Sequence, residues 1–179
     1  IGYDRKYGFL LTDRLTHTKQ EGKKHEVSYN FDLLALLGIK DQDAPLYLPA
    51  DTEAEGFISA LLEKAGIAAH ETCIAIHPGA SCPSKIWPVR RFAELADALH
   101  KQYGWKVVLV AGNADKAHAA AVADAMSSPV VNLAGKTSIL QLASLLRRAA
   151  IFVSNDSGPV HVAAAVGTPV VSIFGRRQP

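Results

Sequence analysis

The pattern of hydrophobic and polar positions is regular from Thr72 onward and irregular before it. Short apolar runs in this region have the length and composition of buried strands, and the segments between them carry apolar residues at helical spacing. Strands and helices that alternate in this way form a parallel sheet with helices on both faces. We therefore predict an α/β fold. The expected strands are Cys73–Ile76, Val107–Val110, Val130–Leu133, Ile151–Val153 and Val170–Phe174, and the expected helices are Phe92–Tyr103, Asp115–Met126, Ser138–Ala149 and Pro159–Val166.

The first 70 residues carry a weaker pattern, and this change predicts two domains, residues 1–70 and residues 71–179. Ile1 opens the chain in the middle of such a pattern, so we expect the sequence to be part of a longer protein. The expected features of the first domain are weak strands at Ile1–Asp4 and Phe9–Thr12, a polar loop at Thr16–Glu26, helices at Val27–Leu37 and Phe57–Ala65, and a connector at Asp41–Asp51.

Composition and charge narrow the class of protein. The 179 residues are 49% hydrophobic and 20% charged, with a net charge of +2, which is typical of a globular domain. Basic residues are scattered in pairs and form no dense patch, so nucleic acid is not an expected partner. No apolar run approaches the roughly 18 to 20 residues that span a bilayer. The two cysteines, Cys73 and Cys82, form no CxxC pair, so we expect a reducing, cytoplasmic location.

The most informative polar run is Asn155–His161, which follows an expected strand and opens an expected helix. In an open α/β sheet, ligands bind beyond the carboxyl ends of the strands. Ser157 and Gly158 would place backbone N–H groups at a helix start, where phosphate is favoured, and His161 would point toward the same anion. The alternative is structural: Asp156 or Ser157 caps the helix, and His161 is a half-buried residue of the first turn.

A second polar run, His77–Pro88, is long for a connection between a strand and a helix, and such loops are often functional. Lys85 within it can neutralise a diphosphate as a point charge. Its alternative is an ordinary solvated lysine beside a tryptophan that anchors the next helix. A weaker signal is Asp115, in another turn between a strand and a helix, where an acidic residue can simply favour the helix N-terminus.

Several well-known motifs are missing. Gly135-Lys136-Thr137 lacks the earlier glycine of a phosphate-binding P-loop, and no GxGxxG follows any expected strand. The seven histidines show neither HxH nor HExxH spacing, and no GxSxG occurs. The residues alone therefore predict a ligand that carries phosphate, with no metal motif.

The order of these motifs resembles one family, the ADP-heptose:lipopolysaccharide heptosyltransferases. The similarity extends over nearly the whole chain, and its most specific part is the Asp-Ser-Gly-Pro…His-Val-Ala-Ala block. The matching runs are His77–Ser81, Ser84-Lys85, Trp87-Pro88, Asn132–Thr137, Asn155–Pro159, His161–Ala165, Gly167–Pro169 and Phe174-Gly175, with Ile1–Arg5, Leu10–Asp13 and His25-Glu26 near the start.

The resemblance implies a GT-B glycosyltransferase with two Rossmann-like domains, of which the second binds the nucleotide sugar. Such enzymes transfer heptose from ADP-heptose to the lipopolysaccharide inner core with inversion, and they need no metal or other cofactor. By this similarity Lys85 contacts the donor diphosphate with Ser81 nearby. Asp156, Ser157 and Gly158 hold the phosphates and the sugar, His161 completes that wall, and Asp115 matches more loosely a position near the adenosine.

The chain also departs from the family pattern. The aspartate expected to act as general base would lie upstream of Ile1, and the family continues beyond Pro179. We therefore expect residues 1–70 to end the acceptor-side domain, and this chain to bind donor without turnover. The expected acceptor is a lipid-anchored core oligosaccharide, with peripheral inner-membrane contact by the full-length enzyme. Two alternatives remain: a GT-B relative that uses another nucleotide sugar (a UDP-sugar transferase or an epimerase), and a non-catalytic nucleotide-sugar-binding domain.

Overall fold

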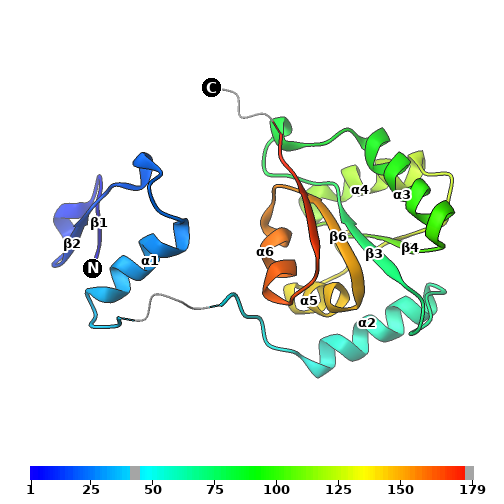
Figure 1. Ribbon diagram of the computed structural model, residues 1–179, viewed down its shortest axis with the longest axis horizontal. Coiled ribbons are helices and arrows are strands. Elements are labelled where there is room, and N and C mark those ends of the chain that lie inside the picture. The colour runs from blue at the N-terminus through cyan, green and yellow to red at the C-terminus, as the bar shows by residue number, and fades with distance from the viewer. Residues whose placement is uncertain (41–44, 176–179) are drawn as a thin grey trace. The chain divides into compact units, whose positions relative to one another are not determined.

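The computed structural model describes residues 1–40 and 45–175, so residues 41–44 of the expected connector and 176–179 of the expected second domain lie outside the described ranges. The chain forms two compact units, Ile1–Pro45 and Leu46–Pro179 (Figure 1). Their elements are β1 (Gly2–Asp4), β2 (Arg14–Thr16), α1 (Glu26–Ala35), α2 (Thr52–Lys64), β3 (Cys73–His77), α3 (Val89–Tyr103), β4 (Lys106–Leu109), α4 (Lys116–Ala125), β5 (Val130–Asn132), α5 (Ile139–Arg148), β6 (Ala149–Asn155), α6 (Gly158–Ala165) and β7 (Val170–Ile173).

The first unit pairs β1 with β2 in parallel and carries α1. The strand expected at Phe9–Thr12 is wrong: Gly8–Leu10 forms a 3₁₀ turn, and the strand that pairs with β1 comes later. The side chains of Phe9 and Leu10 are 73% and 71% exposed, so this apolar pair has no buried face that would favour a strand. Within the unit, the Tyr3 hydroxyl donates a hydrogen bond to the carbonyl of Tyr29 on α1, which links β1 to the helix.

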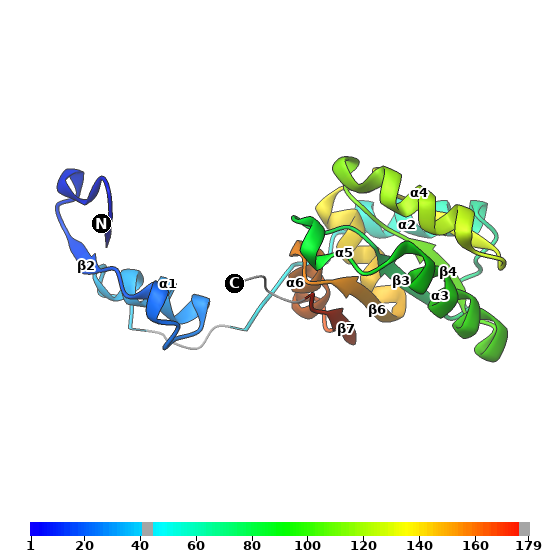
Figure 2. The same cartoon turned by 90° about the horizontal axis from the view of Figure 1, so that it is seen from above.

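The second unit contains a five-stranded sheet in the order β5-β4-β3-β6-β7, and all of its neighbouring strands are parallel. Figure 2 shows β4, β3, β6 and β7 in this order across the sheet. The first strand of the sheet lies at its centre, and the chain builds outward to one edge before it crosses back to build the other. This arrangement confirms the predicted α/β fold with a parallel sheet.

The helices cover both faces of this sheet, as the alternation of side chains along β3 requires. Ile74 and Ile76 pack with α3 and α4, whereas Cys73 and Ala75 pack with α2, α5 and α6 (Figure 1). All four side chains are at most 1% exposed. A strand buried on both faces reads as a continuous apolar run, which is why the periodicity of the sequence identified it.

Helix α2 places the boundary between the units earlier than the sequence suggested. The helix begins at Thr52, before the expected Phe57, because Oδ1 of Asp51 accepts a hydrogen bond from the N–H of Ala54 at 2.7 Å. Its residues Ile58 and Leu62 are buried in the core beneath the sheet. The compact units therefore divide at residues 45 and 46 and not at 70 and 71.

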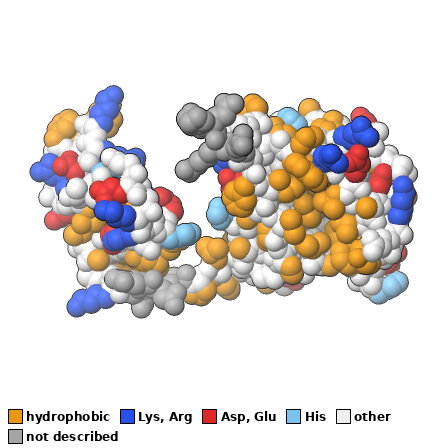
Figure 3. Space-filling model, turned by 45° about the horizontal axis from the view of Figure 1, so that its top comes forward, with side chains coloured by type: hydrophobic (Ala, Val, Ile, Leu, Met, Phe, Trp, Pro, Cys, Tyr) orange, Lys and Arg blue, Asp and Glu red, His pale blue; other side chains and the backbone are white. Residues whose placement is uncertain are grey.

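Strand β7 forms one edge of the sheet and keeps apolar side chains exposed. Val171 is 47% exposed and Phe174, just after the strand, is 73% exposed. Figure 3 shows hydrophobic side chains gathered on a face of the larger unit. Among the described residues, no helix combines the length and apolar character needed to cross a membrane.

Asp97 on α3 ties down the loop between α4 and β5, and its removal should make stability depend less on pH. Its carboxylate accepts hydrogen bonds from the N–H of Ser127 and of Ser128 (3.0 and 2.8 Å) and from the Ser127 hydroxyl (2.6 Å). Although partial burial opposes the shift, these bonds lower the pKa of Asp97. A lowered carboxyl pKa stabilises the fold above about pH 4, the unfolded value, and that stability is lost as pH falls toward the folded pKa.

We expect Asp97→Ala to lower the free energy of unfolding by about 1–2 kcal/mol at pH 7. The difference from wild type should shrink steadily below about pH 4, as the wild-type carboxylate takes up its proton. Urea denaturation at a series of pH values measures both effects. Asp124→Ala, an exposed aspartate on α4, is the control and should change little. A difference that stayed constant down to pH 2 would contradict this account of Asp97.

Candidate functional site

The site lies where the strand order of the sheet reverses. From β3 the chain proceeds to β4 and β5 on one side, whereas β6 and β7 lie on the other. The loops that leave the carboxyl ends of β3 and β6 therefore run in opposite directions and leave a crevice between them, the usual ligand position in an open α/β sheet. His77 ends β3 and Asn155 ends β6, so both polar runs of the sequence begin here.

A polar hollow of about 560 Å³ occupies this crevice. Its walls come from the loops after β3, β4 and β6 and from the start of α6. The structure brings together on this one hollow all seven residues that the sequence singled out: Ser81, Lys85, Asp115, Asp156, Ser157, Gly158 and His161.

Lys85 and Asp156 form an ion pair across the hollow, with 2.6 Å between Nζ and Oδ2. Each side chain remains 38% exposed, so a ligand in the hollow can reach both charges. The N–H of Asp156 donates to the carbonyl of Ile173 on β7, which fixes the backbone beside the carboxylate. Lys85 is therefore not an ordinary solvated lysine, and Asp156 does not cap α6.

No side chain of the described residues caps the start of α6. Ser157 occupies the N-cap position, but its hydroxyl lies 3.0 Å from the hydroxyl of Ser154 and makes no bond to the helix backbone. The helical-cap interpretation of Ser157 is therefore wrong. Gly158 stands at the first helical position, where an N–H has no partner within the helix. This positive end of the helix and the exposed His161 favour an anion in the hollow.

Asn155 anchors the long loop after β3, a role that the sequence analysis did not assign. The side chain is fully buried. Its Nδ2 donates to the carbonyls of Pro78 and Gly79 (2.7 and 3.3 Å), and its Oδ1 accepts from the N–H of Trp87 at 3.0 Å. One amide thus holds both ends of the loop that carries Lys85. An asparagine at the end of a buried strand was the available signal, but its partners are distant in the sequence.

Two glycines allow the close packing that shapes the hollow. A Cβ on Gly79 would collide with the carboxyl group of Asp115, so Asp115 lies directly against the loop backbone. A Cβ on Gly175 would collide with the backbone carbonyl of Ser84, next to Lys85. The chain that leaves β7 therefore supports the Lys85 loop from behind, and side chains at either glycine would displace it.

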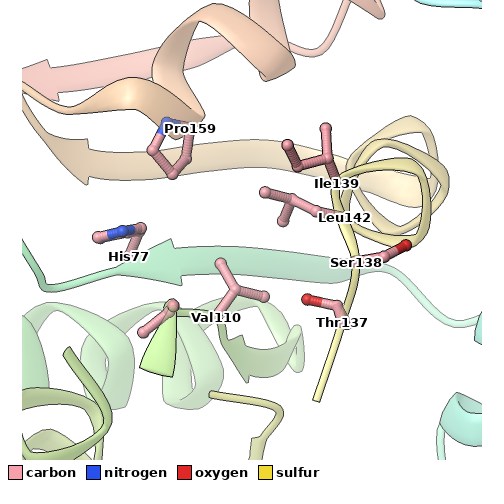
Figure 4. A pocket seen from close by; sticks show the side chains of 9 residues that line it. His77, Val110, Thr137, Ser138, Ile139, Leu142 and Pro159 are labelled. Atoms are coloured by element: carbon pink, nitrogen blue, oxygen red, sulfur yellow. The ribbon is translucent and has the colours of Figure 1, made fainter. Parts of the chain in front are cut away.

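An apolar pocket of about 180 Å³ lies beside the polar hollow. In Figure 4, Ile139 and Leu142 of α5 face His77 and Pro159 across it, and Val110 lies near His77. Burial lowers the pKa of His77, so this ring is neutral near pH 7. An apolar pocket adjoining a charged hollow suits a ligand with a flat ring at one end and anionic groups at the other. Among the described residues, no group of three or more His, Cys, Asp or Glu side chains is placed to hold a metal ion.

The comparison with known families decides what kind of protein this is. The sequence profile of glycosyltransferase family 9 (heptosyltransferase) matches residues 1–179. The chain belongs to this family. Membership accounts for the order of the polar runs along the sequence, and it confirms the family resemblance on which the expected chemistry rests.

Curated proteins similar to this chain are named lipopolysaccharide heptosyltransferases. The chain is 35% identical over 156 residues to lipopolysaccharide heptosyltransferase 3 of Escherichia coli, covering 83% of this chain and 44% of that protein. It is 32% identical over 158 residues to lipopolysaccharide heptosyltransferase 2 of Salmonella typhimurium, covering 86% and 45%. The chain thus spans about half the length of the curated relatives it matches.

Solved family 9 structures share the fold. A glycosyl transferase family 9 protein from Veillonella parvula superposes with a TM-score of 0.81 at 26% identity, over 91% of this chain and 46% of that one. The E. coli ADP-heptose LPS heptosyltransferase II gives a TM-score of 0.67 at 29% identity, over 79% and 43%. These matches confirm the expected GT-B, Rossmann-like architecture of the second unit.

Proposed function

We propose that this family 9 chain carries the donor site of a heptosyltransferase and binds ADP-heptose there. The observation that supports this most directly is the convergence of seven residues, from separate turns of the chain, on one hollow beside an apolar pocket. A nucleotide sugar needs such a divided site, because its base is flat and largely apolar whereas its diphosphate is charged.

The apolar pocket would take the adenine ring between Val110 and Leu142. The diphosphate would then lie in the polar hollow, where Lys85 supplies a full positive charge. The N–H of Gly158 and the dipole of α6 would add partial positive charge on the opposite wall. Ser81 and His161 would complete the contacts to phosphate, and Asp115 would lie toward the ribose.

Asp156 would bind the sugar of the donor. A carboxylate beside a diphosphate repels it, so its presence in this hollow needs a reason. Asp156 balances Lys85 in the free protein, and once phosphate engages Lys85 the carboxylate is available to accept hydrogen bonds from hydroxyl groups. A sugar attached to the terminal phosphate supplies such hydroxyls at that position.

The reaction of the whole protein would be transfer of heptose to the lipopolysaccharide inner core, with inversion and without a metal. The acceptor-side domain would supply the general base, and the first unit of this chain would belong to that domain. Its residues Lys23, Lys24, His25 and Asp32 line a further hollow of about 450 Å³, in which Lys24 is paired with Asp32. Since the acceptor is lipid-anchored, the enzyme would work at the cytoplasmic face of the inner membrane.

Calorimetric titration with ADP, UDP and ADP-heptose tests the proposal. We expect ADP to bind at least about tenfold more tightly than UDP, because adenine offers more apolar ring surface than uracil to the apolar pocket. Asp156→Ala should weaken the binding of ADP-heptose, and the control Asp124→Ala should not. A preference for UDP would mean that the donor is a nucleotide sugar other than ADP-heptose. No binding of any nucleotide would refute a donor site in this chain.

A further inference from the structure

His77 is a buried polar side chain that belongs to both cavities of the site. It ends the central strand β3 and is 4% exposed. Among the described residues, His77 and Pro159 are the two that line the polar hollow and the apolar pocket together. Figure 4 shows the imidazole of His77 at the end of the pocket near Pro159. The ring therefore marks the junction between the two cavities.

Hydrogen bonding fixes which nitrogen of this ring carries the proton. The N–H of Gly79 donates to Nδ1 of His77 at 2.9 Å, so Nδ1 is the acceptor. In the neutral imidazole the proton is then on Nε2. Burial lowers the pKa of His77, and this effect outweighs the opposing influence of the Asp115 carboxylate. The ring accordingly presents a neutral Nε2–H donor.

This donor has no hydrogen-bond partner among the residues that the structure describes. None of the hydrogen bonds among the described residues involves Nε2 of His77. Nε2 of His77 is not among the fully buried unpaired atoms of the described residues, so it is accessible from the cavities, where a ligand or water can accept its hydrogen bond. Pro159, the other residue at the junction, has no N–H to offer. His77 is therefore the side-chain donor available where a ligand passes from one cavity to the other.

We propose that Nε2–H of His77 donates a hydrogen bond to the α-phosphate of the bound nucleotide. This inference rests on the proposed function, because it takes a base in the apolar pocket and a diphosphate in the polar hollow. The group that joins those two parts of a nucleotide is the ribose 5′-phosphate, and it must cross the junction that His77 occupies. His77 would thus be a positioning residue that sets the register between the base and the sugar.

Truncated ligands and two variants of His77 test this assignment. His77→Asn keeps an oxygen near the place of Nδ1, so it can still accept from Gly79, but it has no group in the place of Nε2. His77→Gln can bring an amide N–H toward the place of Nε2. We expect His77→Asn to weaken the binding of ADP and AMP roughly tenfold or more beyond any effect that it has on the binding of adenosine. His77→Gln should recover part of that loss.

The outcomes separate this inference from the proposed function. Equal weakening of ADP, AMP and adenosine by His77→Asn would mean a structural role and overturn the inference, as would unchanged binding of all three. If the wild-type chain bound no adenine nucleotide, the proposed function would fail as well. As a readout independent of any variant, the ¹⁵N resonance of Nε2 in the wild-type protein should shift on addition of AMP and not of adenosine. A shift with both ligands, or with neither, would also overturn it.

Discussion

Replacing Lys85 by methionine is expected to weaken ADP binding roughly ten- to hundredfold. Methionine keeps the length of the apolar stem and removes the charge, so the loop after β3 should keep its position. A hydrogen bond to a charged group contributes about 1.5 to 3 kcal/mol, which corresponds to that range in affinity. Lys85 is close enough to engage a phosphate because its Nζ already reaches Asp156 across the hollow. Calorimetry with ADP measures the loss directly.

Lys136→Met is the matched control for this experiment. Lys136 is also exposed and its Nζ donates to a backbone carbonyl, that of Asn132 at 2.9 Å, but it does not line the polar hollow. Its replacement should leave ADP affinity unchanged. The double variant Lys85→Met/Asp156→Asn should bind ADP better than Lys85→Met alone, because Lys85→Met leaves the Asp156 carboxylate facing the phosphates. Unchanged ADP affinity in Lys85→Met would mean that the diphosphate does not bind in this hollow.

Asn155→Ala should lower both the stability of the second unit and its affinity for ADP. The substitution leaves the N–H of Trp87 and the carbonyls of Pro78 and Gly79 without their side-chain partner in a buried place. Each unsatisfied buried group costs about 1–3 kcal/mol, and partial relaxation of the loop reduces the sum. We expect a loss of roughly 2–4 kcal/mol in the free energy of unfolding, measured by urea denaturation.

Asn132→Ala provides the comparison, because Asn132 is also an asparagine at the end of a strand, the outer strand β5. Its Oδ1 accepts one hydrogen bond, from the N–H of Ala134 at 3.0 Å, and the residue is only partly buried. We expect its loss to cost about 1 kcal/mol and to leave ADP binding unchanged. If Asn155→Ala and Asn132→Ala lowered the free energy of unfolding equally, Asn155 would not anchor the loop as described.

Apolar periodicity predicted the second unit well because its central strands are buried on both faces and its helices on one. Helix α5, which was expected at Ser138–Ala149, begins with a capping box in which the Ser138 and Gln141 side chains each bond the other's backbone N–H. Strand β6 is longer than expected, Ala149–Asn155 against Ile151–Val153, because Ser154 and Asn155 are polar yet buried. Their pairing with neighbouring strands, and not their hydrophobicity, keeps them in the sheet.

The position of the site could be predicted from the sequence, but part of its machinery could not. Polar runs after two buried strands indicate one sheet edge, and the family resemblance suggested a role for each of the seven residues. His77 and Asn155 were missed as individual residues because their importance lies in what surrounds them. The partners of Asn155 are 68 to 77 residues away in the sequence. No local pattern reports such contacts.

The central place of β3 also has a consequence for how the site comes into being. Lys85 and Asp156 are 71 residues apart, and four strands with their helices separate the start of β3 from the end of β6. Closing so long a loop is entropically costly, and contacts of this range form late and slowly compared with local ones. The two walls of the hollow therefore meet only when the whole α/β order has been completed. A nucleotide that bridges both walls selects the finished fold over any partly folded chain.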